Sequence, residues 1–157
     1  KVAFDLTALA LAFALLHEFS HVKLLAEKAQ PDTLPEEELA CDVWARDFMT
    51  AKLAAYAQAH GHTYEEVSQK RAMGLALAAT VIHAITPTAA QWGNSEYPPL
   101  SDRIQAIVAG FNLPPDSRFW FFAACLLVGI MRQEHRPLDI TGHTPQALAE
   151  ALIAQIR

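Results

Sequence analysis

The sequence predicts an all-α fold, a compact domain of about six helices. Apolar residues recur at a helical spacing over long segments, and no segment keeps the strict alternation that a strand requires. Proline and glycine residues separate these segments. Two Thr-x-x-Glu capping boxes, at Thr33 and Thr63, mark helix starts. We therefore expect one helical domain over residues 1–157.

The first two expected helices have clear boundaries. The first covers about residues 3–29 and is stopped by Pro31. The second begins at the Thr33 cap and has Pro35 in its first turn, where a missing N–H is harmless. Its apolar residues continue at helical spacing until Gly61, which is expected to end it.

Proline, glycine and capping residues also bound the remaining helices. The third is expected to begin at the Thr63 cap and to end before Pro87, where a proline-rich loop follows. Gly110 is expected to stop the fourth helix, and two further prolines precede the fifth. The last helix opens at Thr144, which is followed by a proline. The expected ranges are 64–85, 101–109, 117–133 and 145–156.

Composition limits the possible partners and compartments. The chain has 157 residues, of which 52% are hydrophobic, enough for a sizeable core. Its formal net charge is −5 and it has no run of basic residues, so no nucleic-acid partner is expected. Cys41 and Cys125 lie far apart in the sequence, which does not indicate a disulfide framework. A reducing, cytoplasmic location is the simpler expectation.

Two apolar runs raise the question of membrane insertion. Residues 8–16 and 119–131 are apolar, but both runs are shorter than the roughly 18–20 residues that span a bilayer. We therefore expect buried core helices and no stable membrane insertion. The chain begins at Lys1 without a methionine, so we expect a segment of a longer protein, whose preceding part could complete a substrate cleft.

Residues 17–21, His-Glu-Phe-Ser-His, match the His-Glu-x-x-His motif of zinc proteases. His17 and His21, four positions apart, lie on one helix face, so both imidazoles can reach a single ion. Zn²⁺ binds neutral imidazole, and a catalytic zinc site combines three protein ligands with water. Glu18 is then placed to accept a proton from that water. The alternative is a core helix in which both histidines have protein partners.

The third ligand is expected from the next helix. The segment between His21 and Glu38 is long enough for an antiparallel return of the chain, so Glu38 can meet the metal. Asp42, one turn further on, can accept the free N–H of a ligand histidine. Glu37 is an alternative ligand, but it has no such partner one turn on. The acidic residues here also have a simpler explanation, because acids stabilise the start of a helix.

A Glu-x-x-x-Asp segment after His-Glu-x-x-His resembles the gluzincin metallopeptidases. This resemblance implies that His17, His21 and Glu38 bind Zn²⁺, that Glu18 is the catalytic base, and that Asp42 holds a ligand histidine.

Three segments of the chain, residues 15–21, 36–45 and 97–104, are also similar in order to the Lit-type phage-exclusion peptidases. That resemblance implies an intracellular bacterial enzyme that cleaves a protein target in phage defence. The chain departs from the pattern at Tyr97, where a histidine is expected. The ImmA/IrrE-type regulatory proteases are the alternative family.

Three further residues are candidates for the catalytic machinery. Arg103 could stabilise an oxyanion or bind a substrate carboxylate, or it could be a surface arginine that pairs with Asp102 or another acid. Tyr97 could donate to the oxyanion, or simply pack before two prolines. His83 lies in an apolar helix, where a core histidine with a protein partner is favoured over a role in the transition state.

The sequence therefore supports two functions. The first is a zinc-dependent endopeptidase that acts on a protein or peptide substrate. The second is a non-catalytic zinc-binding or protein-interaction domain, which is favoured slightly because no substrate-binding strand is expected. A fourth protein ligand would indicate a structural ion, whereas an open position would indicate catalysis. The sequence does not predict the substrate or the oligomeric state.

Overall fold

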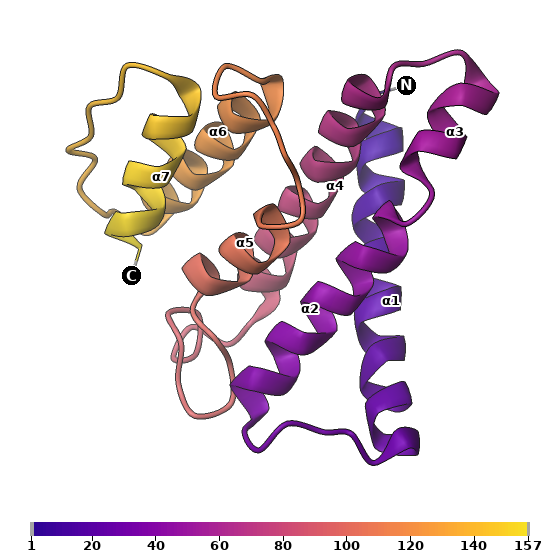
Figure 1. Cartoon of the computed structure of the whole chain (residues 1–157). Coiled ribbons are helices and arrows are strands. Elements are labelled where there is room, and N and C mark those ends of the chain that lie inside the picture. Colours follow the sequence, from indigo (N-terminus) through magenta and orange to yellow (C-terminus); the bar gives the residue numbers. More distant parts are fainter. Residues whose placement is uncertain (1, 157) are drawn as a thin grey trace.

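The structure is a computed structural model that describes residues 2–156. Over this range it contains seven α-helices and no β-strand, so the predicted all-α class is confirmed (Figure 1). The helices are α1 (Val2–Glu27), α2 (Leu34–Thr50), α3 (Leu53–His60), α4 (Tyr64–Ile85), α5 (Leu100–Val108), α6 (Arg118–Gln133) and α7 (Pro145–Gln155).

The capping residues explain most of the boundaries. Thr33 caps α2 by accepting a hydrogen bond from the backbone N–H of Glu36. Thr63 and Glu66 form both halves of the predicted capping box at the start of α4. Gly61 ends α3 with a positive φ of 67°, a conformation that glycine adopts without a steric penalty.

The helix expected to run from Thr33 to Gly61 is instead two helices. The chain breaks at residues 51–52, between α2 and α3. The hydroxyl of Thr50 donates to the backbone carbonyls of Arg46 and Asp47, 2.9 and 3.3 Å away. Such bonds can bend a helix, but Thr7 and Thr80 make the same kind of bond within the unbroken helices α1 and α4, so the Thr50 bonds alone do not account for the break.

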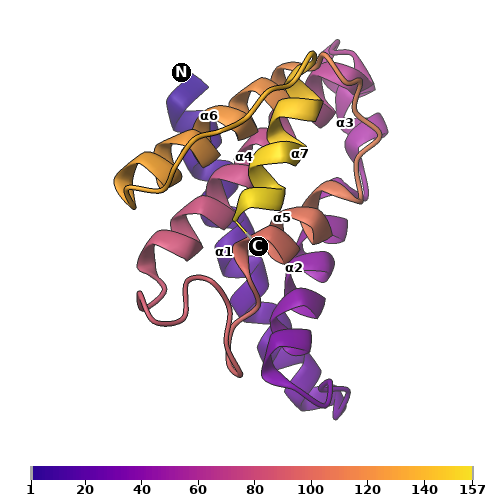
Figure 2. The ribbon, with the colours of Figure 1, turned by 90° about the vertical axis from the view of Figure 1, so that its left-hand side faces the viewer.

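Helices α1, α2 and α4 form the part of the fold that carries the motif. α1 packs against both α2 and α4, and α5 lies against α2 and α4 (Figures 1 and 2). α6 and α7 pack on each other, and α6 also contacts α4. One main core joins these helices; its largest fully buried side chains include Phe13, Leu75 and Phe119.

Gly74 brings α1 close to α4. A Cβ atom built at this position would lie 2.5 Å from Cβ of Leu9, closer than two such atoms approach in proteins. The absence of a side chain therefore sets the separation of the two helices. Because α1 carries the His-Glu-x-x-His motif, this contact helps to fix where the motif lies.

The apolar face of α1 is less buried than expected. Leu11 and Leu15, within the apolar run that we expected in the core, are each at least 60% exposed. By length and composition alone α1 is long and apolar enough to cross a membrane, and 22% of its most apolar window is buried. Core helices of soluble proteins and signal sequences share this length and composition, so these properties do not distinguish the three cases. The expectation that α1 does not insert stably into a membrane stays a prediction.

Candidate metal centre

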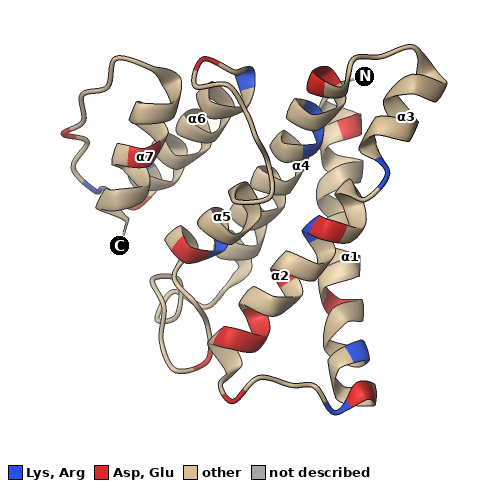
Figure 3. Ribbon diagram, in the orientation of Figure 1, with Lys and Arg blue, Asp and Glu red and all other residues tan. Residues whose placement is uncertain are grey.

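The second half of α1 and the first half of α2 lie side by side, joined by a short connector. The two helices cross obliquely and run in roughly opposite directions, and the connector spans the gap between the end of α1 and the start of α2 (Figure 1). Acidic residues gather along the first turns of α2, next to this part of α1 (Figure 3). The chain reversal expected between His21 and Glu38 is therefore present.

His17, His21 and Glu38 form a cluster that could hold a metal ion, with one ligand atom from each within 4.8 Å of the others. The two Nε2 atoms are 3.2 Å apart. The Glu38 carboxylate oxygens lie 3.3 Å from each of them, Oε2 from His17 and Oε1 from His21.

These distances fit a tetrahedral ion. With Zn–N bonds of about 2.0–2.1 Å, two ligands of a tetrahedral site lie about 3.3 Å apart. The separation of the two nitrogens, 3.2 Å, is close to this edge length, and a different oxygen of Glu38 approaches each nitrogen at 3.3 Å. No fourth residue joins the cluster among those described, so a tetrahedral ion would keep one position for another molecule.

The outer nitrogen of each histidine faces a carboxylate. Nδ1 of His17 lies 2.9 Å from Oδ1 of Asp42, at hydrogen-bonding distance although not ideally aligned. Nδ1 of His21 lies 2.7 Å from Oε1 of Glu37. Carboxylates in these positions fix the ring orientation and direct the Nε2 atoms toward a common point.

Glu37 therefore differs from the role that the sequence suggested for it. We weighed it as an alternative ligand, but its carboxylate holds the outer side of His21. Gln30, in the connector, donates to its other oxygen at 3.4 Å. The signal that points to Glu37 is the need of each ligand histidine for an outer partner; Asp42 supplies only one.

Arg103 is buried, not a surface arginine, and its partners are Asp42 and Glu38, not Asp102. Its Nε and Nη2 atoms donate to the two oxygens of Asp42 at 2.8 and 2.9 Å. Nη2 also lies 3.3 Å from Oε2 of Glu38. One guanidinium thus holds the carboxylate behind His17 and touches the candidate ligand Glu38, which makes Arg103 a positioning residue in this structure. Contact with substrate stays a prediction.

The charges in the cluster shift its pKa values. Burial lowers the pKa of His17, but hydrogen bonds to Asp42 and Glu38 outweigh it and raise this pKa from 6.5 to about 9. Burial raises the pKa of Asp42 and of Glu38, yet His17 and Arg103 reverse the effect, so both carboxyls have lowered pKa values. In the metal-free protein a proton on His17 therefore supplies the positive charge that a cation would supply.

Glu18 follows His17 but points into a different environment. It is exposed and forms no hydrogen bond or ion pair with any residue from 2 to 156. A carboxylate without protein partners beside the cluster is free to take a proton from a reacting water. Its predicted role as catalytic base stays a prediction.

Tyr97 and His83 are not part of the cluster. Together with Arg103 they line a crevice of about 10 Å³, room for about one water molecule. Nε2 of His83 lies 3.1 Å from Oε1 of Glu134, and the His83 ring meets Trp92 edge-on at 5.0 Å. His83 thus has the partners of a buried core histidine, the alternative that the sequence favoured. The catalytic roles considered for both residues stay predictions.

An exposed aromatic row flanks the motif. The Phe19 ring lies 6.1 Å from that of Trp44, which in turn lies 5.4 Å from Phe48. Phe19 and Phe48 are about 60% exposed. The sequence alone does not single out this row, because exposure of an apolar residue within a helix depends on its neighbours.

The fold and the cluster define a helical protein in which two histidines and a glutamate from neighbouring helices converge as metal ligands do. The family described as Peptidase U49 matches residues 1–123. The chain belongs to this family and is thus a peptidase by family. Searches of curated proteins and of solved structures gave no match. The matched region includes α1, α2 and α5, and so every residue of the cluster and Arg103.

Proposed function

We propose that this chain is a zinc-dependent endopeptidase of the gluzincin kind, in which His17, His21 and Glu38 hold Zn²⁺. The observation that carries the proposal is the convergence of three ligand groups: the two Nε2 atoms lie 3.2 Å apart, and each lies 3.3 Å from an oxygen of Glu38. Two imidazole nitrogens that face each other at this distance, with a carboxylate at the third corner, are suited to share a cation. The peptidase family supports hydrolysis of a peptide bond as the reaction.

Zn²⁺ held there would supply a Lewis acid that polarises a peptide carbonyl and lowers the pKa of water to about 7. The protein would do the rest. Asp42 and Glu37 orient the imidazoles, and Arg103 keeps Asp42 ionised and in place. Glu18 accepts the proton of the attacking water and transfers it to the leaving amine.

The substrate would lie along the exposed surface beside the motif. The aromatic row of Phe19, Trp44 and Phe48 offers an apolar surface there for substrate side chains. The described residues contain no strand edge, so recognition would rest on side-chain contacts more than on strand pairing.

Replacement of Glu18 by Gln tests the proposal. The variant should retain zinc and its fold, while cleavage of a peptide library, followed by mass spectrometry, should fall at least 100-fold, because general-base catalysis contributes about 10²–10⁴-fold. Glu27→Gln, also exposed on α1, is the matched control and should cleave like the parent. Cleavage by Glu18→Gln at the parental rate would show that the assigned base is wrong. Zinc binding without any cleavage by the parent would favour the non-catalytic alternative.

The cellular setting is a further part of the proposal. The similarity to Lit-type phage-exclusion peptidases supports a cytoplasmic protein target and a role in phage defence. Cys41 and Cys125 are both free, as a reducing compartment would require. A strain that carries the gene should restrict phage growth, and a strain that carries the Glu18→Gln variant should not. Equal phage yields in the two strains would rule out the proposed role in phage defence.

A further inference from the structure

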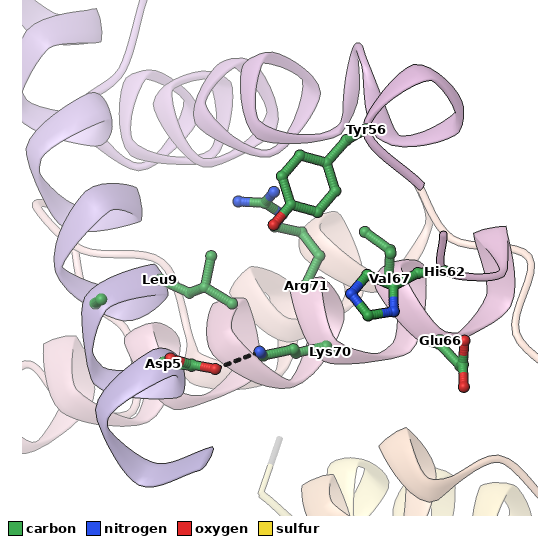
Figure 4. A pocket seen from close by; sticks show the side chains of 9 residues that line it. Asp5, Leu9, Tyr56, His62, Glu66, Val67, Lys70 and Arg71 are labelled. Carbon is green, nitrogen blue, oxygen red and sulfur yellow. Dashed lines mark hydrogen bonds and ion pairs between the residues drawn. The ribbon is translucent and has the colours of Figure 1, made fainter. Parts of the chain in front are cut away.

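A cavity of about 640 Å³ lies between α1, α3 and α4, away from the cluster (Figure 4). None of its lining residues belongs to the proposed metal centre. Its wall on α1 includes Leu9, eight residues before His17, so it lies about 12 Å along the helix from that residue. Its volume falls within the roughly 300–1,000 Å³ typical of sites for small molecules.

The ionisable groups of the cavity are mostly paired. Lys70 points at Asp5 and forms an ion pair with it, as Figure 4 shows. Glu66 is engaged by the backbone N–H and the hydroxyl of Thr63, 2.9 and 3.0 Å away, in the cap of α4. These pairs neutralise or occupy the charges at two sides of the cavity.

Arg71 is the exception. It is half-buried and forms no hydrogen bond or ion pair with any described residue. Partial burial lowers the pKa of its guanidinium, and the nearby Tyr56 hydroxyl offsets part of this effect. In Figure 4 the guanidinium lies beside the Tyr56 ring and hydroxyl, on the opposite side from Glu66. An uncompensated arginine in a cavity is a ready partner for a carboxylate, which it can bind through two parallel N–H bonds.

The rest of the wall is apolar. Ala8 and Leu9 on α1 face Val67 on α4 across the space. The cavity therefore combines one cationic end with an apolar part, and Figure 4 shows the His62 ring beside Val67.

We propose that this cavity binds a small amphipathic carboxylate, with its acid group on Arg71 and the Tyr56 hydroxyl and its apolar body against Ala8, Leu9 and Val67. The acid could belong to the C-terminal residue of a peptide or to a free aliphatic acid, because both present the same chemistry. Glu66 repels an anion from one side, and Lys70 is already paired with Asp5, so the acid group binds at the Arg71 end.

Calorimetric titration of the whole protein tests the proposal with two pairs of probes. N-acetyl-L-leucine and octanoate should bind saturably, whereas N-acetyl-L-leucine amide and octanol should bind at least tenfold more weakly. Tighter binding of N-acetyl-L-leucine would identify the C-terminal residue of a peptide as the ligand, and tighter binding of octanoate would identify a free aliphatic acid. Inorganic phosphate, which lacks an apolar body, should bind more weakly than either acid.

Two variants locate the site. Arg71→Ala should weaken binding of the acids about tenfold or more, and Arg132→Ala, an exposed arginine on α6, should leave it unchanged. Ala8→Phe adds a ring to the apolar wall, leaves Arg71 itself unchanged and should weaken both acids. If Arg71→Ala does not fold, Ala8→Phe and Arg71→Lys, which loses the forked geometry, give the same test.

Several results would overturn the proposal. One is the absence of saturable binding by either acid up to about 10 mM. Another is undiminished binding by Arg71→Ala or Ala8→Phe, which would place the acids elsewhere, for example at the proposed metal centre. If the amide bound as tightly as the acid, the carboxylate would not be what the cavity recognises. If phosphate bound as tightly as the acids, the apolar body would not contribute to binding.

Discussion

Replacement of Asp42 by Ala should destabilise the protein severely. Asp42 is fully buried and Arg103 is 4% exposed, and two hydrogen bonds of 2.8 and 2.9 Å join them. Without the carboxylate, the guanidinium stays in the interior with only Glu38, 3.3 Å away, as a counter-ion. Breaking a buried pair in this way costs about 3–5 kcal/mol, and the remaining Glu38 contact places the loss near the lower end, about 3 kcal/mol.

Urea unfolding followed by circular dichroism measures this loss. A chelator should be present, so that metal binding does not contribute to the stability of either protein. With a slope of about 1–3 kcal/mol per molar urea, a loss of about 3 kcal/mol lowers the midpoint by about 1–3 M. Asp42→Asn, which retains the shape and an acceptor oxygen, should lose less.

Two comparisons isolate the buried charge as the cause. Asp47→Ala removes an exposed partner of Arg46 on the same helix and should cost less than about 1 kcal/mol. Asp42→Leu combined with Arg103→Met removes both buried charges and should recover most of the loss. A loss below about 1 kcal/mol for Asp42→Ala, or a double variant less stable than Asp42→Ala, would refute the reasoning.

Three further predictions follow from the same structure. Glu37→Gln should weaken zinc binding about 10–100-fold, as measured by competition with a zinc dye, because His21 loses its outer carboxylate. Glu36→Gln, at an exposed neighbouring position, should leave the zinc affinity unchanged. Equal affinities for the two variants would contradict the proposed role of Glu37 in holding His21. Gly74→Ala should lower the free energy of unfolding by about 1–3 kcal/mol through overpacking. Gly129→Ala, whose new Cβ meets no atom within 4 Å, should raise it by up to about 1 kcal/mol. The reverse order in urea unfolding would disprove the close contact at Gly74. In the metal-free protein the raised pKa of His17 contributes stability that is complete below pH 6.5 and is lost as the pH rises through about 9. The urea midpoint of unfolding should therefore fall over this pH interval. A midpoint that rises with pH would be inconsistent with the raised pKa.

The sequence predicts the fold class and most boundaries because local signals set them. Thr63, Gly61 and Pro145 act on their own neighbours, and the structure has helix ends at all three. The break after Thr50 is different, because no proline, glycine or capping box marks it and the next helix, α3, packs against α4. Spacing alone does not distinguish such a break from a continuous helix.

Some residues of the candidate site could likewise be predicted from local signals in the sequence, and others could not. His17 and His21 share a helix face by their spacing, and a chain reversal brings Glu38 to them, so these residues could be singled out in advance. The pairing of Arg103 with Asp42 joins positions 61 residues apart, and nothing local indicates it. The role of Glu37 required knowledge of which way the His21 ring faces. Contacts between distant segments are decided by the whole packing of α1, α2 and α5.

The exposed apolar face of α1 is the clearest departure from expectation. The sequence shows that the helix is apolar, but not which neighbours cover it. Leu11 and Leu15 remain exposed because α2 and α4 pack against the other side of the helix.

Zinc content tests the central claim most directly. The purified parent and His17→Ala, dialysed side by side against the same trace of Zn²⁺, should be compared by atomic emission, with Glu18→Gln as a variant that leaves the ligands intact. We predict about one zinc per chain in the parent and in Glu18→Gln, and none in His17→Ala. A parent without zinc, or His17→Ala with as much zinc as the parent, would contradict a metal centre built on these two helices.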